Sequence, residues 1–201
     1  MPRFGAIVFD LLTALLDSWT LWGVVAGDDE LGARWRRTSL DLIYASGAYR
    51  DYDAIVAEAA ALAGVDERRS AELLARWDEL EPWPEAPSVL RDLATDHRLA
   101  LVTNTSEDRA RRAAGKLGVD VDVLVSAETA GFYKPRPEPY RAAVDALGVA
   151  ALFVAGSPGD VPGAEAAGLP VVWHNRVGAA AAGGEPLAVI ETLEPLPSLV
   201  R

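Results

Sequence analysis

The stretch Phe4-Gly-Ala-Ile-Val-Phe-Asp10, a short apolar run that ends in a carboxylate, decides the fold of this chain. An unbroken apolar run of this length predicts a strand that is buried on both faces of a parallel sheet. Open α/β sheets bind their ligands at the carboxyl ends of such strands. We therefore expect Asp10 to lie at a ligand-binding edge of the sheet.

Three later segments carry polar side chains in comparable positions. Leu99-Ala-Leu-Val-Thr103-Asn104 predicts a second buried strand, which ends in a hydroxyl and an amide. Tyr133-Lys134-Pro135 places one lysine in a proline-rich loop, and Leu152-Phe-Val-Ala-Gly-Ser-Pro-Gly-Asp160 predicts a further strand with an aspartate after it. Because parallel strands end at one edge of their sheet, these side chains can converge on one crevice.

The rest of the chain divides into two kinds of pattern. Residues 15–83 show helical periodicity punctuated by Gly47, Gly64 and Pro82, and contain no segment that predicts a strand. From Pro84 onward, expected helices (86–95, from 106 to about 118, 137–147 and 163–167) alternate with expected strands (99–103, 121–126, 151–155, 170–174 and 188–191). This alternation predicts an α/β fold with a parallel sheet, helices on both faces, and a small helical module inserted after the first strand.

Composition restricts the classes of function. The formal net charge of −11 disfavours nucleic acid and anionic membranes as partners. The 201 residues include no cysteine and two histidines, so disulfides, thiolate chemistry and the usual zinc patterns are excluded. Met1-Pro-Arg3 leads directly into the first strand and no apolar stretch could span a bilayer, so we expect a cytoplasmic protein without a leader.

The convergent residues suit nucleophilic catalysis by a carboxylate. Burial would raise the pKa of Asp10, whereas a neighbouring ammonium, for which Lys134 is the candidate, would lower it and keep the nucleophile ionised. Simpler interpretations stay open for each residue taken alone. Asp10 and Asp160 could cap helices, Lys134 could be solvated, and Thr103 and Asn104 could be turn residues.

Taken together, these motifs resemble the haloacid dehalogenase superfamily, and in particular its 2-haloacid dehalogenase branch. The resemblance rests on six segments that span nearly the whole chain: Phe9-Asp10 with Asp17 downstream, Trp35-Arg36, Leu99–Asn104, Tyr133-Lys134-Pro135 with Tyr140, Leu152-Phe-Val with Asp160-Val-Pro-Gly163-Ala164, and Trp173-His-Asn175-Arg176. It implies a three-layer, Rossmann-like core formed by residues 1–14 and 84–201, and a helical cap formed by residues 15–83.

The resemblance also implies a reaction. Asp10 would attack the carbon that bears the halogen and form an aspartyl ester, which water would then hydrolyse at the aspartyl carbonyl. Lys134 would keep Asp10 ionised, and Asp160 would orient Lys134 or the water. The implied protein is a hydrolase that requires no cofactor, and its partner is a small carboxylic acid.

The same resemblance implies a substrate site. Thr103 would hold the substrate carboxylate, and Arg36 from the cap would stabilise the departing halide together with Asn104. The remaining implied binding residues are Tyr140, Ser157 and Leu12. Members of this branch commonly form homodimers, and Trp19 and Trp22 near the cap are candidates for such a contact; burial inside the monomer is the alternative.

This chain departs from the family pattern at several positions. Thr13 and Ala14 stand where relatives have Gly-Thr, so the hydroxyl that normally bonds the nucleophile is missing unless Thr13 replaces it. Leu12 replaces the general acid of phosphatase relatives and the tyrosine of the dehalogenases. Ser157 stands at an asparagine position of the dehalogenases, and Gly159 replaces a bulky tryptophan.

Two other functions therefore stay open. Ala155 replaces the serine of the dehalogenases and the acid that helps phosphatase relatives to bind Mg²⁺, which leaves Asp10 and Asp160 as ligands for a weak magnesium site. One alternative is thus a magnesium-dependent, phosphatase-like hydrolase. The other is a catalytically weak or inactive binding protein on the same fold.

Overall fold

The computed structural model describes residues 4–201. Met1-Pro-Arg3 lie outside the described residues. They begin the proposed core segment 1–14, and the expectation of no leader rests on them. None of the helices within residues 4–201 is long and apolar enough to cross a membrane.

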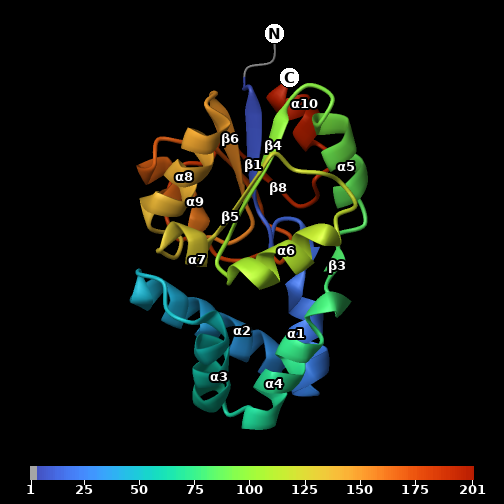
Figure 1. The fold of residues 1–201 in the computed structure, drawn as a ribbon. Helices are drawn as coiled ribbons and strands as arrows, with labels where there is room; N and C mark the ends of the chain where they lie inside the picture. The colour runs from blue at the N-terminus through green and yellow to red at the C-terminus, as the bar shows by residue number, and fades with distance from the viewer. Residues whose placement is uncertain (1–3) are drawn as a thin grey trace.

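A six-stranded parallel sheet forms the centre of the core, with β1 (Ala6–Asp10) inside it (Figure 1). β1 pairs with β4 (Arg98–Thr103) on one side and with β6 (Ala151–Ala155) on the other. The full order is β5 (Val123–Ser126), β4, β1, β6, β7 (Val171–His174) and β8 (Ala188–Ile190). The predicted α/β fold is confirmed.

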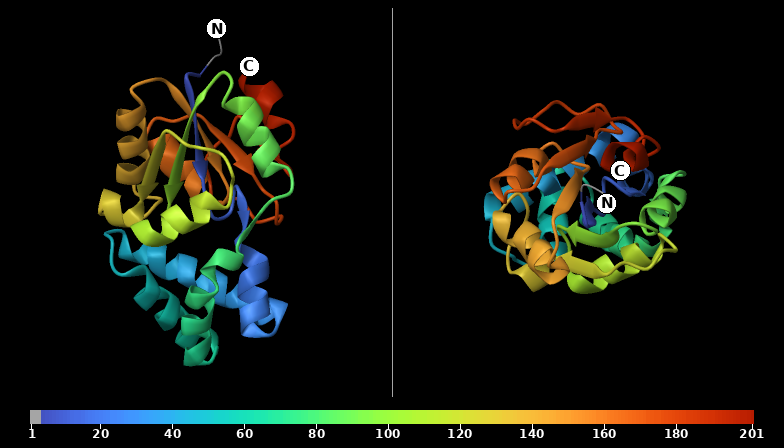
Figure 2. Two further views of the ribbon diagram at one scale, coloured as in Figure 1. Left: turned by 45° about the vertical axis from the view of Figure 1, so that its right-hand side comes forward. Right: turned by 90° about the horizontal axis from the view of Figure 1, so that it is seen from above.

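Successive side chains of β1 point to opposite faces of the sheet, so the core consists of two packed layers. Ile7 and Phe9 belong to an apolar cluster that includes side chains of α5 (Ala86–Leu93) and α10 (Leu196–Val200). Ala6 and Val8 belong to the opposite cluster, with α8 (Pro137–Leu147) and α9 (Asp160–Ala166). The views in Figure 2 show helices on both sides of the sheet, with α6 (Glu107–Gly115) near the carboxyl ends of the strands.

Four helices form a second body below the carboxyl ends of the strands (Figure 1). They are α1 (Ser18–Ala26), α2 (Asp29–Ser46), α3 (Tyr52–Ala63) and α4 (Glu67–Ala75), followed by the short 3₁₀ turn η1 (Trp77–Glu79). A Cβ on Gly32 would lie 2.5 Å from the Cα of Gly23, so only a glycine lets α1 and α2 approach this closely. This contact fixes the position of α2, which carries Arg36.

The expectation of no strand within residues 15–83 is wrong. β2 (Leu16–Asp17) and β3 (Glu81–Pro82) pair antiparallel where the chain enters and leaves the helical body. Two residues are too few to produce an alternating pattern in the sequence, so only the tertiary structure shows this pair.

Other differences concern short elements and helix ends. The expected helix 163–167 begins earlier, at Asp160, and Pro162 stands in its first turn, where it displaces no helical hydrogen bond. α7 (Ala127–Ala130) and α10 were not predicted. Trp22 is fully buried, which removes it as a candidate for a dimer contact.

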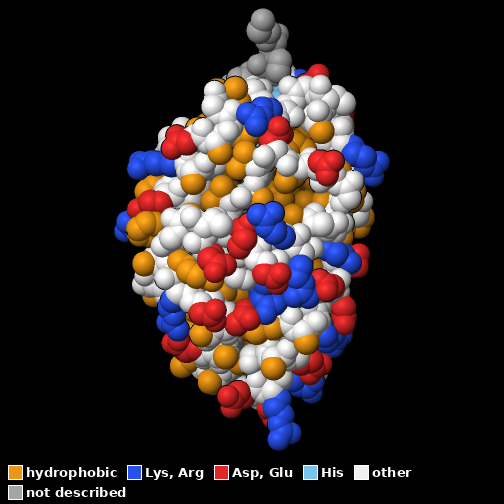
Figure 3. Space-filling model, viewed as in Figure 1, with side chains coloured by type: hydrophobic (Ala, Val, Ile, Leu, Met, Phe, Trp, Pro, Cys, Tyr) orange, Lys and Arg blue, Asp and Glu red, His pale blue; other side chains and the backbone are white. Residues whose placement is uncertain are grey.

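Ion pairs join the helical body to the core. Arg109 of α6 donates two hydrogen bonds of 2.6 Å to the carboxylate of Asp53 on α3. Arg112, one turn further along α6, pairs with Asp78 at 2.9 Å. Figure 3 shows acidic and basic side chains together around the waist of this face. The cap is thereby held over the end of the sheet where Asp10 lies.

Candidate active site

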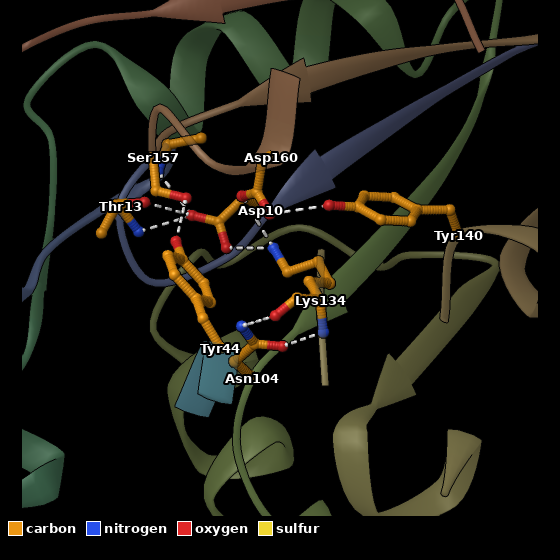
Figure 4. A network of polar contacts seen from close by, with 9 residues as sticks. Asp10, Thr13, Tyr44, Asn104, Lys134, Tyr140, Ser157 and Asp160 are labelled. Carbon is orange, nitrogen blue, oxygen red and sulfur yellow. Dashed lines mark hydrogen bonds and ion pairs between the residues drawn. The ribbon is translucent and has the colours of Figure 1, made fainter. Parts of the chain in front are cut away.

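Asp10 lies at the carboxyl end of β1, and its two carboxylate oxygens have different partners (Figure 4). Oδ2 accepts three hydrogen bonds: from the backbone N–H of Thr13 (2.8 Å), from the Thr13 hydroxyl (2.6 Å) and from the backbone N–H of Ala14 (3.0 Å). Oδ1 accepts from Nζ of Lys134 at 2.7 Å. The side chain is almost fully buried, so these contacts fix both its orientation and its charge.

Thr13 supplies the hydroxyl that Ala14 lacks. The turn after β1 folds back over Asp10, so that both residues reach the same carboxylate oxygen. The loop after β6 packs closely against this turn, since a Cβ on Gly156 would lie 2.2 Å from the Ala14 nitrogen and 2.4 Å from the Thr13 hydroxyl oxygen. A glycine at 156 is therefore required for the turn to hold its position.

Lys134 bridges two buried carboxylates. Its ammonium lies 2.7 Å from Oδ1 of Asp10 and 3.0 Å from Oδ2 of Asp160, and its side chain is 1% exposed. Asn104 positions the lysine through the backbone, because its Oδ1 accepts from the Lys134 N–H (2.7 Å) and its Nδ2 donates to the Lys134 carbonyl (3.0 Å). Asn104, which directly follows β4, thus aligns the loop that carries the Lys134 ammonium.

The charges of these groups depend on one another. Burial raises the pKa of Asp10, but the Lys134 ammonium and the hydrogen bonds from Thr13 outweigh it and hold that pKa below its ordinary value. Burial likewise lowers the pKa of Lys134, yet the two carboxylates raise it above the ordinary lysine value. At neutral pH, Asp10 is therefore ionised and lies beside a charged lysine, which is the state that a carboxylate nucleophile requires.

For Asp160, the effects that raise the pKa outweigh those that lower it. Burial raises the pKa of its carboxyl above the ordinary value, the negative charge of Asp10 adds to this effect, and Lys134 opposes it. The hydroxyl of Tyr140 donates to Oδ1 of Asp160 at 2.9 Å. Tyr140 is fully buried and does not line the cavity at Asp10; its hydrogen bond orients Asp160, and a contact with substrate stays a prediction.

A narrow cavity of about 10 Å³ lies over Asp10, which is room for about one water molecule. Its walls bring together residues of the sheet edge, of the loops and of α2: Asp10, Leu12, Thr13, Arg36, Leu40, Thr103, Asn104, Lys134, Ser157 and Asp160. All of the predicted site residues except Tyr140 are therefore in one place. Asn104 lines the cavity, but its carbonyl and one amide hydrogen are used on Lys134, which gives it chiefly a positioning part.

Two cavity-lining side chains have buried polar atoms without a hydrogen-bond partner in residues 4–201: Thr103 through its hydroxyl and Arg36 through Nε. Arg36 is 3% exposed, and its guanidinium lies over the rings of Trp22 (5.3 Å) and Trp19 (5.8 Å). It forms no ion pair with the described residues. A buried cation and a buried hydroxyl without hydrogen-bond partners are costly, and an anion in the cavity that both residues line would give each of them a partner.

Tyr44 of α2 is a site residue that the sequence analysis missed. Its hydroxyl lies 3.1 Å from the hydroxyl of Ser157, which lines the cavity, although Tyr44 itself does not line it (Figure 4). Ser157 therefore contacts the cap as well as the cavity. The absence of a bulky side chain at Gly159 was the one signal that another residue fills this space.

The donor set does not suit a resident metal ion. Within the described part of the chain, no three His, Cys, Asp or Glu side chains cluster as metal ligands. Asp10 and Asp160 already share the ammonium of Lys134, so a cation between them would meet a fixed positive charge.

Comparison with known proteins shows the family to which the chain is similar. A family model for haloacid dehalogenase-like hydrolases matches residues 14–168. The chain is 32% identical to (S)-2-haloacid dehalogenase 1 of Pseudomonas sp. (strain CBS-3), over 88% of the chain and 87% of that protein. It is 28% identical to haloacetate dehalogenase H-2 of Moraxella sp. (strain B), over 89% and 88% respectively.

Solved structures show the same fold. The L-2-haloacid dehalogenase from Xanthobacter autotrophicus superimposes with a TM-score of 0.85 at 24% identity, covering 99% of both chains. A second dehalogenase structure gives a TM-score of 0.87 at 25% identity, covering 99% of this chain and 98% of the other. The chain belongs to the haloacid dehalogenase-like hydrolase family and is an enzyme of that family.

Proposed function

We propose that this hydrolase cleaves the carbon–halogen bond of 2-haloacids through an aspartyl ester on Asp10. The observation that carries the proposal is the pair of unpartnered buried groups, on Arg36 and Thr103, in the cavity over the ionised Asp10. A 2-haloacid brings a carboxylate and releases a halide, and each of these anions needs such a partner. The two curated relatives named above have names that describe the same chemistry.

Oδ1 of Asp10 is the attacking atom. Oδ2 accepts three hydrogen bonds and has no lone pair free, whereas Oδ1 accepts only from Lys134. Oδ1 forms a bond to the carbon next to the substrate carboxylate, and the halide leaves with the electron pair of the carbon–halogen bond. The Thr103 hydroxyl holds the substrate carboxylate, and the Arg36 cation stabilises the charge that develops on the halogen.

Water then hydrolyses the ester at the carboxyl carbon of Asp10. Oδ2 is now the ester carbonyl oxygen, so its three donors from Thr13 and Ala14 form an oxyanion hole for the tetrahedral intermediate. Asp160 lines the cavity, and its raised pKa suits a base that accepts the proton of the water. When the tetrahedral intermediate collapses, the old Oδ1 leaves with the electron pair of its bond to the carboxyl carbon and takes back from Asp160 the proton that the water gave up, so it departs as the hydroxyl of the 2-hydroxyacid. The water oxygen stays on Asp10, whose carboxyl loses its remaining proton to solvent because its pKa is low.

The test is an assay of halide and phosphate release over a panel of 2-haloacids and phosphomonoesters, with and without Mg²⁺. We expect halide release without Mg²⁺, and its loss in Asp10→Asn. Asp17→Asn is the matched control, because Asp17 caps α1 outside the cavity and an asparagine keeps that cap. One turnover in ¹⁸O-labelled water should leave the label on Asp10.

Each other outcome selects a different function. Halide release that persists in Asp10→Asn contradicts the proposed nucleophile. Phosphate release that requires Mg²⁺ favours the phosphatase-like alternative, and no release of either product favours a binding protein. The homodimer stays a separate prediction, which light scattering during size-exclusion chromatography measures.

A further inference from the structure

Tyr44 fills the space that a side chain at position 159 would need. A Cβ on Gly159 would lie 3.0 Å from Cζ and from the hydroxyl oxygen of Tyr44, and 3.1 Å from Cε2. The φ of Gly159 is −70°, which any residue can adopt, so the backbone itself does not require a glycine there. The glycine makes room for a ring that comes from the cap.

One hydrogen bond and apolar packing hold this ring in place. The Tyr44 hydroxyl lies 3.1 Å from that of Ser157 (Figure 4). Burial raises the pKa of Tyr44 to about 12, and the charge of Asp160 adds to the effect, so the phenol is neutral at physiological pH. The contact is a neutral pair of hydroxyls, which is weaker than the charged hydrogen bonds around Asp10.

A groove of about 650 Å³ lies on the other side of this contact. Its walls are mostly apolar and come from the cap and from two core loops, among them Trp19, Ala33, Leu40, Pro158, Val177 and Ala179. Leu40 and Ser157 line both the groove and the cavity over Asp10, so the two spaces share a wall, and Tyr44 contacts that wall at Ser157 from the side of the groove. The volume of the groove is in the ordinary range of small-molecule sites.

The two spaces differ greatly in size. The cavity at Asp10 has room for about one water molecule, which is less than any substituted acid requires. When the Tyr44 ring turns away from Gly159, it loses its hydrogen bond to Ser157 and part of its packing against the apolar cluster, and the cavity opens toward the groove. The shared wall therefore places an apolar site directly beside the reacting carboxylate.

We propose that Tyr44 is a gate between the two spaces, and that the preferred substrate is a 2-haloacid whose apolar carbon chain passes Tyr44 into the groove. The chemical part of this inference rests on the proposed function. The binding part does not, because the groove should select long-chain carboxylates even when no bond is broken.

Kinetics with two substrates that share a leaving group test the proposal. The measured quantity is the ratio of kcat/KM for 2-bromooctanoate to that for 2-bromopropionate. Ala33→Trp fills the groove from α2, and we expect it to lower this ratio at least tenfold. The matched control is Ala45→Trp on the same helix, where the side chain is exposed and lines neither space; the ratio should stay within twofold.

A second groove variant keeps the proposal testable if Ala33→Trp does not fold. Val177→Trp enters from the opposite wall at a position that is 48% exposed, and it should lower the same ratio. Tyr44→Phe removes the hydrogen bond to Ser157 but keeps the ring, and should lower KM for 2-bromooctanoate more than for 2-bromopropionate. An unchanged ratio in both tryptophan variants overturns the proposal.

Calorimetry with unhalogenated acids separates this inference from the proposed function. Octanoate should bind at least tenfold more tightly than propionate, and Ala33→Trp should abolish that difference. If no haloacid is turned over but this preference is present, the reaction is wrong and the groove assignment stands. If 2-bromopropionate is turned over but octanoate binds no better than propionate, the groove assignment is wrong and the reaction stands.

Discussion

Thr13→Val is the most informative single substitution in this site. It removes the hydroxyl that donates to Oδ2 of Asp10 at 2.6 Å, and it keeps the branched shape of a side chain that is 5% exposed. The backbone N–H groups of Thr13 and Ala14 continue to donate to Oδ2. The variant therefore isolates one of three donors to the oxygen that becomes negative during ester hydrolysis.

The two chemical steps should respond differently. Loss of one donor to a developing oxyanion costs about 2.7–4 kcal/mol, or roughly 10²- to 10³-fold in the rate of hydrolysis. Ester formation draws charge away from the Asp10 carboxylate, so the same hydrogen bond stabilises the free carboxylate at least as much as the transition state of attack. The attack should slow by about tenfold or less, because an orienting contact is lost without a loss of oxyanion stabilisation.

We expect burst kinetics from this difference. With 2-bromopropionate, Thr13→Val should release about one equivalent of bromide per active site and then turn over slowly, while mass spectrometry of the intact protein detects the accumulated ester. Thr13→Ser, which keeps the hydroxyl, is the control and should stay within about threefold of the parent. Steady-state rates for the valine and serine variants that agree within threefold would refute the assigned role of the hydroxyl.

Two further substitutions test the ion cluster and the turn. Lys134→Met leaves two buried carboxylates without a cation, so halide release at pH 7 should be lost and the free energy of unfolding should fall by about 3–5 kcal/mol. In the parent, the depressed pKa of Asp10 contributes stability that is lost as the pH falls through that pKa. In the variant, burial without the ammonium raises the pKa of Asp10, so protonation relieves the cost of the buried charge. The free energy of unfolding in urea should therefore recover, relative to the parent, as the pH falls from 7 to 4. Gly156→Ala places a Cβ 2.2 Å from the Ala14 nitrogen and should lower both Tm and activity, whereas Gly115→Ala, in open space on a helix, should raise stability by about 0.5–1 kcal/mol.

The architecture could be predicted because its signals are local and repeated. The apolar runs at β1, β4 and β6 are each long enough to indicate a buried strand. β1 and β4 end in polar residues that line the cavity, and the cavity-lining residues Ser157 and Asp160 follow the end of β6. The two-residue strands β2 and β3 could not be predicted, since their pairing joins Leu16 to Pro82 across the whole helical body. Periodicity carries no information at that length.

The members of the site could be predicted better than their partners. Residue type and position, after a strand or in a loop, indicated Asp10, Lys134 and Asp160, and the structure places the Lys134 ammonium within hydrogen-bond distance of both carboxylates. Hydrogen-bond partners depend on shifts of about an ångström that the sequence does not show. This is why Tyr140 was expected at the substrate, although its hydroxyl is used on Asp160.

The departures from the family pattern differ in whether another side chain compensates for them. The hydroxyl absent from Ala14 comes from Thr13, and the bulk absent from Gly159 comes from Tyr44. Leu12 has no such substitute, because Asp160 is the only other carboxyl that lines the described cavity, and both of its oxygens accept hydrogen bonds, from Lys134 and Tyr140, so it has no proton to donate in the first step. In the first step, attack by Asp10 on a phosphomonoester expels an alkoxide that needs a proton from a general acid, whereas attack on a 2-haloacid expels a halide that needs none. Leucine at this position is therefore compatible with dehalogenation and unfavourable for phosphatase chemistry, which is the strongest argument in this chain for choosing between the two reactions.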